Sequence, residues 1–157
     1  MQKSHVSKSI IYKPIDKFDG ENGLLSNFYP TIIKFYDIDF PTVEHAYQAS
    51  KSINPSFWLE LSKLHAKQAG RAKQLGNRTA LRQDWELVKI SFMRKFLKQK
   101  FIQRPFREFL LSTHPRPLIE GNYWHDNFWG DCKCKKCENI VGRNMLGELL
   151  MKIRGSL

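Results

Sequence analysis

The stretch FPTVEHAYQASK, residues 40–51, marks more clearly than any other where a helix of this chain begins. Thr42 follows Pro41, and a threonine at this place readily accepts a hydrogen bond from a free backbone N–H of the first helical turn. Glu44 then lies in that first turn, where the helix dipole favours a negative charge. We therefore expect a helix that is capped by Thr42 and runs through VEHAYQASK, residues 43–51.

Strand signals precede this helix, and further helices follow it. Residues 9–15 and 31–40 are rich in β-branched and aromatic residues, and YDID in the second segment predicts a turn between two short strands. Caps, prolines and apolar periodicity predict five later helices. One starts at Asn54-Pro55, and a following one ends at Gly76. A third starts at Asp84, a fourth runs from Pro105 to before Pro115, and the last follows Asn144. The expected fold class is α+β, a mainly α-helical single domain with a small antiparallel sheet.

The composition is that of one globular domain. The chain has 157 residues, of which 41% are hydrophobic and 13% aromatic, enough to bury one sizeable core. No apolar run approaches the roughly 20 residues that span a bilayer, and the first residues lack an apolar signal core. We expect residues 1–17 to be a short basic N-terminal extension, residues 18–157 to form the domain, and the protein to be cytoplasmic and independent of membranes.

The charge is strongly positive, with 26 Lys and Arg against 15 Asp and Glu and a formal net charge of +11. Such an excess favours a polyanionic partner, either nucleic acid or a phosphorylated small molecule. Solubility alone is the other explanation, and the charge does not identify the anion.

The segment EHAYQASK, residues 44–51, carries the first candidate chemistry. At about 100° per residue, Glu44, Gln48 and Lys51 project from nearly the same face of the helix. A carboxylate, an amide and an amine on one stripe suit proton transfer or nucleophilic attack. An ordinary polar face turned toward water explains the same pattern.

A second candidate region is the long loop over residues 120–143. Trp124 and Trp129 lie among Gly, Asn and Asp, where their aromatic faces suit stacking on a base or a sugar. Asp126 and Asp131 are candidates for polarising a ribose hydroxyl or a water, with turn formation as the alternative.

Two arginines are candidates for phosphate contacts. Arg78 in LGNR and Arg143 in VGRN each follow a glycine at a helix junction, where bare backbone N–H groups and a guanidinium form a phosphate cradle. Capping with an exposed arginine is the competing explanation. With Arg143 we also assign its neighbour Asn144 to substrate binding.

All three cysteines fall within HDNFWGDCKCKKC, residues 125–137. A structural zinc site takes four ligands, and here only Cys132, Cys134 and Cys137 are present, with His125 the nearest candidate for a fourth. We expect free thiols in a basic flap, with no metal and no cofactor. A small zinc-stabilised DNA-binding protein remains an alternative.

Several motifs in order resemble the NADAR family of YbiA-like N-glycosidases, over about residues 18–154. They are LSNFYP at 25–30, FPTVEHAYQASK at 40–51, GNR at 76–78, DW at 84–85, the M-R-x-x-L-x-x-K-F run from Met93, and FWGD with GRNMLGELLMKIR up to Arg154. The resemblance implies a compact, mainly helical α+β domain without a metal. The cysteine-bearing segment 131–141 stands where some relatives have a shorter Gly-rich one.

The resemblance implies hydrolysis of a ribosyl C–N bond. One associated substrate class is the first two intermediates of riboflavin biosynthesis, which are phosphoribosylamino-pyrimidines, and their cleavage disposes of reactive metabolites. The other is ADP-ribose attached to guanine in DNA. A non-catalytic module that binds ADP-ribose or nucleic acid is a further alternative. The expected partner is a phosphorylated ribosyl-pyrimidine or an ADP-ribosyl group, and DNA is an alternative partner.

The resemblance also assigns residues. Glu44, Lys51 and Asp126 would be catalytic, with Glu44 stabilising positive charge on the ribose carbon or activating water, and Lys51 suited to a covalent adduct at that carbon. Trp85, in the DW motif, and Trp129 would clamp the heterocycle, although Trp85 also begins the apolar stripe of its helix.

Overall fold

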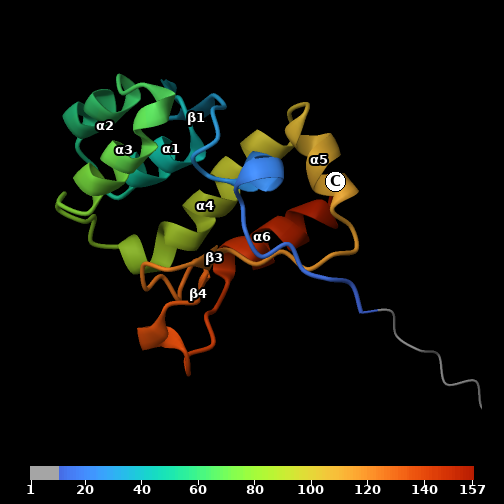
Figure 1. The fold of residues 1–157 in the computed structure, drawn as a ribbon. Helices are drawn as coiled ribbons and strands as arrows, with labels where there is room; N and C mark the ends of the chain where they lie inside the picture. The colour runs from blue at the N-terminus through green and yellow to red at the C-terminus, as the bar shows by residue number, and fades with distance from the viewer. Residues whose placement is uncertain (1–10) are drawn as a thin grey trace, which may run out of the picture.

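The computed structural model describes residues 11–157, and in that range it contains six α-helices and two pairs of short strands (Figure 1). The helices are α1 (Val43–Ser50), α2 (Pro55–Ser62), α3 (Ala69–Gly76), α4 (Trp85–Phe101), α5 (Phe106–Ser112) and α6 (Met145–Arg154). The strands are β1 (Ile33–Phe35), β2 (Ile38–Phe40), β3 (Gly121–Asn122) and β4 (Asp131–Cys132). Three 3₁₀ segments cover Gly20–Leu25, Ala66–Gln68 and Lys135–Cys137.

The expected fold class is confirmed. The helix starts follow from local capping. The Thr42 side chain accepts a hydrogen bond of 3.2 Å from the backbone N–H of His45 at the start of α1. Asn54 caps α2 in the same way through Ser56, with Pro55 at the first helical position.

The predicted hairpin is also present. Strands β1 and β2 pair antiparallel with Ile33 opposite Phe40, and the turn residues Tyr36 and Asp37 both adopt positive φ. In contrast, residues 11–14 do not form the strand predicted over 9–15, and Ser9 and Ile10 lie outside the described residues. Ile15 makes a single parallel bridge to Leu118 and is 3% exposed.

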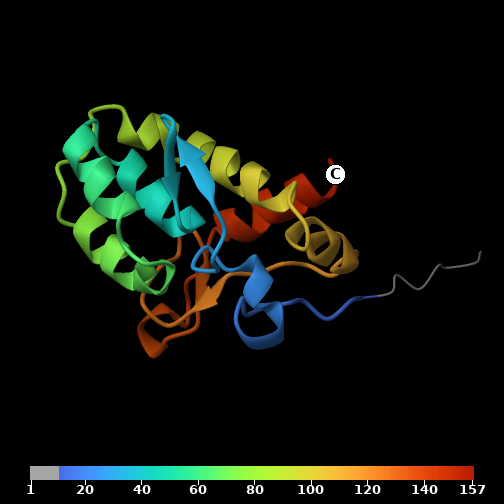
Figure 2. The same cartoon turned by 90° about the horizontal axis from the view of Figure 1, so that it is seen from above.

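Helix α1 lies at the centre of the domain. It packs against α2, α3 and α4, and the hairpin lies along α1 and α4 (Figures 1 and 2). All eight of its residues are buried, including Glu44 and Gln48. The solvated polar face that the sequence left open is therefore excluded for these two side chains. Within residues 11–157 no helix combines the length and apolar character required to cross a membrane.

Helix α4 connects the two ends of the molecule. Its Phe96 and Phe101 are fully buried, and it continues the core from α1 toward α5 and α6. The loop that contains β3 and β4 folds back across the start of this helix, so residues far apart in sequence meet beside α1 (Figure 1). The short parallel pairing of β3 with β4 was not predicted from the sequence.

Candidate functional site

A cavity of about 610 Å³ lies between α1, α3, the start of α4 and the loop that follows β3. This volume is in the range of pockets that enclose small-molecule ligands. Two of its walls come from segments singled out by motif, the LSNFYP loop and the loop around Trp129. Five of the predicted site residues line this cavity: Glu44, Lys51, Trp85, Asp126 and Trp129.

Helix α1 contributes the proposed chemical groups. Glu44, Gln48 and Lys51 all line the cavity, as expected from their shared helix face. The Gln48 side-chain amide donates a hydrogen bond of 2.7 Å to Oε1 of Glu44, which fixes the carboxyl group. The Glu44 backbone N–H donates to the carbonyl of Asn27 at 3.0 Å and thereby joins α1 to the LSNFYP loop.

Burial shifts the pKa values of the acid and the amine toward each other. Removal from water raises the pKa of the Glu44 carboxyl, although the Gln48 hydrogen bond lowers it in part. Burial likewise lowers the pKa of the Lys51 amine, against the opposing effect of the Glu44 charge. The positive charge of Lys73 adds to the lowering at Lys51. Such paired shifts are typical of groups that exchange protons at neutral pH.

Helix α3 holds this constellation in place at the GNR motif. Asn77 accepts a hydrogen bond of 3.3 Å from Nζ of Lys51. A Cβ atom at Gly76 would lie 1.9 Å from Oε1 and 2.9 Å from Cβ of Gln48. The close approach of α3 to α1 thus requires a glycine, and the motif has a packing reason.

We expect Gly76→Ala to displace Gln48, to destabilise the protein by about 1–3 kcal/mol through overpacking, and to lower activity because Glu44 loses its fixed partner. Urea unfolding and a kinetic assay measure the two effects. Gly70→Ala is the matched control, because it lies on the same helix with nothing within 4 Å of the added methyl group. Equal behaviour of the two variants would contradict this role of Gly76.

Aromatic side chains form the second wall. Trp85 and Trp129 both line the cavity, and each contacts the ring of Tyr47, with centroid distances of 5.3 Å and 5.4 Å. Trp85 is only 6% exposed, so it serves the core and the cavity at once. Trp124 is 58% exposed at the cavity edge, and Nζ of Lys73 lies 5.5 Å from its ring centroid. The aromatic surface thus extends from the interior to the mouth.

Asp126 combines a turn with a place in the cavity wall. Its Oδ1 accepts hydrogen bonds from the backbone N–H groups of Phe128 and Trp129, at 3.1 Å and 2.8 Å. The turn therefore presents Trp129 to the cavity. Turn formation and polarisation of a ribose hydroxyl or a water, the two roles considered for Asp126, are compatible. Asp131 lies elsewhere, since it bonds to the N–H of Gly142 and pairs with Lys133.

Three residues predicted to bind substrate do not line the cavity: Arg78, Arg143 and Asn144. The Arg143 guanidinium lies over the ring of Phe128, at 4.8 Å from its centroid. Asn144 braces the backbone, because its side chain accepts from the N–H of Glu120 at 2.9 Å and donates to the carbonyl of Leu118 at 2.8 Å. These contacts give Asn144 a structural role, and its assignment to substrate binding stays a prediction.

The positive charge at the cavity comes from lysines instead. Lys17, Lys51, Lys73 and Lys89 line it, and only Lys51 was identified from the sequence. Lys73 lies on α3 and Lys89 on α4, and neither belongs to one of the motifs. Lysines on amphipathic helices are ordinarily solvated, so their pattern gave no signal.

Unsatisfied polar atoms mark the cavity further. Among residues 11–157, four buried side-chain atoms have no hydrogen-bond partner, and three belong to cavity residues: Asn27 Oδ1, Gln48 Oε1 and Glu120 Oε2. Buried polar atoms are normally paired, so three such atoms around one cavity indicate that a ligand or water satisfies them. Glu120 was missed in the sequence because its position in a loop carries no pattern.

Glu120 predicts a pH dependence of stability. Burial, followed by the nearby charges of Asp126 and Glu44, raises its pKa from 4.5 to about 7. The folded state therefore holds this proton more tightly than the unfolded state, and stability falls as the pH rises from about 4.5 to about 7.

We expect Glu120→Gln to raise the free energy of unfolding by about 2 kcal/mol at pH 8, allowing for partial screening, and to change it little at pH 4. Urea titrations at the two pH values measure the difference. The same change at Glu60, which is exposed on α2, is the control. A Glu120→Gln effect that does not depend on pH would rule out this explanation.

The cysteines lie outside the cavity wall. Cys132, Cys134 and Cys137 are not joined in disulfides, and they gather around His125, whose neighbours Trp124 and Asp126 do line the cavity. The cysteine segment therefore adjoins the candidate site through His125 and through the pairing of β4 with Asn122, which lines the cavity.

Comparison with known proteins gives consistent results. The sequence profile of the NADAR domain matches residues 15–157. Over 136 residues the chain is 35% identical to the protein named N-glycosidase YbiA of Escherichia coli (strain K12), covering 86% of this chain and 81% of that protein. A protein named N-glycosidase from Nostoc punctiforme is 38% identical over 136 residues, covering 84% and 83%.

A longer plant protein and a solved structure extend the comparison. The protein named chloroplastic riboflavin biosynthesis protein PYRR, from Zea mays, is 36% identical over 162 residues, which cover 93% of this chain and 24% of that protein. The NMR structure of E. coli YbiA superposes with a TM-score of 0.78 at 31% identity, covering 97% of this chain and 89% of the other. The similarity thus extends over fold and sequence together.

Proposed function

The chain belongs to the NADAR family of N-glycosidases, and from this we propose that it hydrolyses the ribosyl C–N bond of the first two intermediates of riboflavin biosynthesis. These substrates are phosphoribosylamino-pyrimidines, and their hydrolysis disposes of reactive metabolites. The maize relative is named a riboflavin biosynthesis protein, which supports this substrate class, and a cavity of about 610 Å³ suits a small heterocycle with one phosphate.

One observation carries the proposal. Glu44 and Lys51 face the same cavity from one helix, and burial raises the pKa of the acid while it lowers the pKa of the amine. A raised pKa favours the protonated form of the acid, and a lowered pKa favours the neutral form of the amine. These are the forms that protonate a leaving nitrogen and attack a carbon atom.

In the proposed reaction Glu44 acts on the leaving group. Its protonated carboxyl donates a proton to the departing nitrogen, and the resulting carboxylate then accepts a proton from the attacking water. Gln48 keeps the carboxyl in one orientation throughout, since its amide bonds to Oε1. The negative charge of the Glu44 carboxylate that forms in this step also stabilises the positive charge that develops on the ribose carbon.

Lys51 offers a covalent route to the same products. When the ribosyl ring opens, C1 and the amino nitrogen of the pyrimidine form an imine. The neutral Lys51 amine adds to C1 and displaces the pyrimidine amine, so that one imine replaces another and the proton count is unchanged. Water then hydrolyses the lysine imine and releases the sugar phosphate.

The remaining cavity residues position the substrate. Trp85 and Trp129 present aromatic surface on which the pyrimidine can stack. The carboxylate of Asp126 is placed to accept hydrogen bonds from ribose hydroxyls. The lysines of the cavity wall, in place of the arginines predicted from the sequence, neutralise the phosphate.

A second candidate is removal of ADP-ribose from guanine in DNA. Two observations favour it: the net charge of +11, and the exposed Tyr123 and Trp124 at the cavity mouth, 64% and 58% exposed. Exposed aromatic rings beside a lysine are typical of surfaces that hold single-stranded nucleic acid. The small-molecule substrate is preferred because Glu44, the proposed acid, is buried in the cavity wall with an exposure of 6%.

A direct comparison of the two substrates tests the proposal. The purified chain is incubated with a phosphoribosylamino-pyrimidine and, separately, with a DNA oligonucleotide that carries ADP-ribosylated guanine. Chromatography then measures the released pyrimidine and the released ADP-ribose. We expect turnover of the first substrate at least tenfold faster than of the second. Faster turnover of the DNA substrate would replace the proposal by the second candidate, and binding of either without turnover would leave a binding module.

A further inference from the structure

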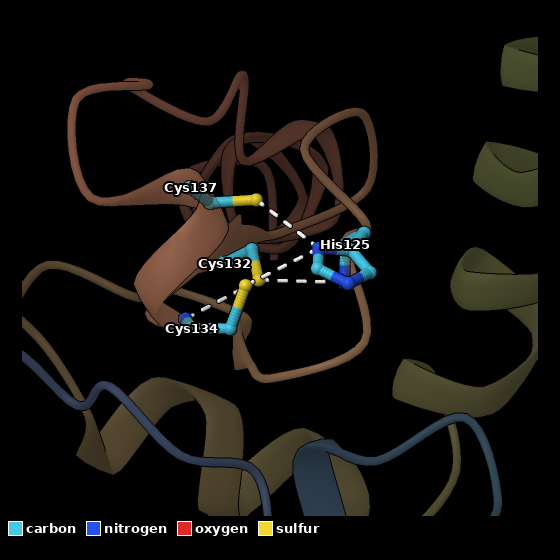
Figure 3. Close-up of side chains that lie close together, drawn as sticks. All are labelled: His125, Cys132, Cys134 and Cys137. Atoms are coloured by element: carbon cyan, nitrogen blue, oxygen red, sulfur yellow. Dashed lines mark hydrogen bonds between the residues drawn. The ribbon is translucent and has the colours of Figure 1, made fainter.

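Three cysteines and one histidine meet at a single point of the loop that contains β3 and β4 (Figure 3). The Sγ atoms of Cys134 and Cys137 lie 3.2 Å and 3.4 Å from Nδ1 of His125. One donor atom from each of the four residues, with Cys132 as the fourth, lies within 4.8 Å of every other. Ordinary hydrogen bonding explains this poorly, because one imidazole nitrogen shares a single proton with a single partner.

The spacing is that of a tetrahedral metal site. Zinc bonds of about 2.3 Å to sulfur and about 2.0–2.1 Å to nitrogen place ligand atoms about 3.8 Å apart for two sulfurs and about 3.6 Å apart for sulfur and nitrogen. The sulfur–nitrogen distances of this cluster fall within a few tenths of an ångström of that value. A single ion at the centre would therefore require only small shifts of the side chains.

The surroundings of the sulfur atoms suit thiolates. The backbone N–H groups of His125 and Cys134 donate to Sγ of Cys132, at 3.3 Å and 3.5 Å. The side-chain amide of Asn127 donates to Sγ of Cys137 at 3.2 Å. Thiolate is the form that binds metal, and donors from the outer shell stabilise it and orient the ligand. These contacts are a second observation, independent of the clustering.

We propose that His125, Cys132, Cys134 and Cys137 bind one structural Zn²⁺ ion. Three thiolates and an imidazole form a complete tetrahedral ligand set, which leaves no position for water or substrate. Soft sulfur ligands select zinc against magnesium and calcium. Lys133, Lys135 and Lys136 offset the net negative charge of such a centre. This replaces the free thiols expected from the sequence.

The zinc would fix one wall of the cavity. His125 adopts a φ of +68°, uncommon for a residue with a side chain, and it lies between Trp124 and Asp126. The ion ties this residue to the 3₁₀ segment Lys135–Cys137, so that the turn at Asp126 keeps its position. The role is structural and does not depend on which substrate the cavity accepts.

Metal analysis of the whole chain tests the site without any activity assay. The protein is produced with zinc in the medium and purified with a reductant but no chelator, and its metal content is measured by mass spectrometry. We expect one zinc per chain. Exchange for Co²⁺ should give the intense visible bands of tetrahedral cobalt together with sulfur-to-cobalt charge transfer.

Variants locate the ion. Cys137→Ser and His125→Ala should each weaken zinc binding by more than about tenfold in competition with a chelating dye, since even an outer-shell partner contributes that much. Lys136→Ser, beside Cys137 in the same segment, should retain one zinc. The wild-type measurements keep the proposal testable if a ligand variant fails to fold.

Two results would overturn the proposal. One is reduced wild-type protein that contains only substoichiometric zinc and develops no cobalt bands. The other is zinc that remains bound equally in the ligand variants and in Lys136→Ser. Neither result involves turnover, so failure of the zinc site and failure of the proposed reaction are told apart.

Discussion

Replacing Glu44 by glutamine is expected to lower kcat by about 10²–10⁴-fold, the range that a positioned general acid or base contributes. The change removes the ionisable proton and keeps the size of a side chain that is 6% exposed. Because the Gln48 amide can still donate to the new carbonyl oxygen, the fold and the affinity for substrate should change little. Kinetics of pyrimidine release and a binding titration measure the two effects.

The control for this prediction is Glu60→Gln, an exposed glutamate on the neighbouring helix α2. It should leave kcat and KM unchanged. If Glu44→Gln instead retained kcat and lost only affinity, Glu44 would be a binding residue and the proton transfer would have to be reassigned.

Replacing Lys51 by methionine is expected to reduce turnover by roughly 10³-fold or more, as removal of a covalent nucleophile does. Methionine keeps most of the length of the apolar stem and removes the amine, which lies 5.9 Å from the centroid of the Tyr47 ring. During turnover, borohydride should reduce the imine at Lys51 to a stable secondary amine, so that the mass of the intact wild-type protein increases by that of one sugar phosphate less one oxygen atom. The lowered pKa of Lys51 favours this step, because more of the amine is neutral at pH 7.

Two variants separate the covalent role from the charge. Lys51→Arg keeps a positive charge but forms no imine under these conditions, so it should be as inactive as Lys51→Met. Lys63→Met, at an exposed lysine that follows α2, should leave both turnover and trapping intact. An active preparation that gives no adduct dependent on Lys51, or an active Lys51→Arg variant, would limit the lysine to electrostatic stabilisation.

Local structure was predictable where it rests on local interactions. Thr42 and Asn54 cap their helices, and Pro105 and Asp84 precede helices as expected, because caps and prolines act within one turn. The strand predicted around Ile15 failed because its pairing depends on Leu118, more than 100 residues away. The pairing of β3 with β4 was missed because each strand has only two residues and so carries no alternating pattern.

The site was predictable only in part. Helix geometry placed Glu44 and Lys51 on one face without knowledge of the rest of the fold. Lys73 and Glu120 were missed because no spacing relates them to α1. The motif around Asn144 gave no sign that this side chain bonds to the backbone of Glu120 and Leu118. A motif indicates which residues are candidates for a role, and the contacts in the folded structure determine what each side chain can bind.

The order of the helices and the shared face of Glu44, Gln48 and Lys51 could be read from the sequence alone, because caps and helical periodicity act between neighbours along the chain. Family membership could be read in the same way, because its motifs are runs of adjacent residues. The burial of Glu44 and Gln48 on this face follows only from the packing of α2, α3 and α4 around α1, which removes them from water. Burial then shifts the pKa values that make an acid and an amine useful. The tertiary structure also brings His125 to the three cysteines, since the spacing of residues along a loop does not fix their distances through space.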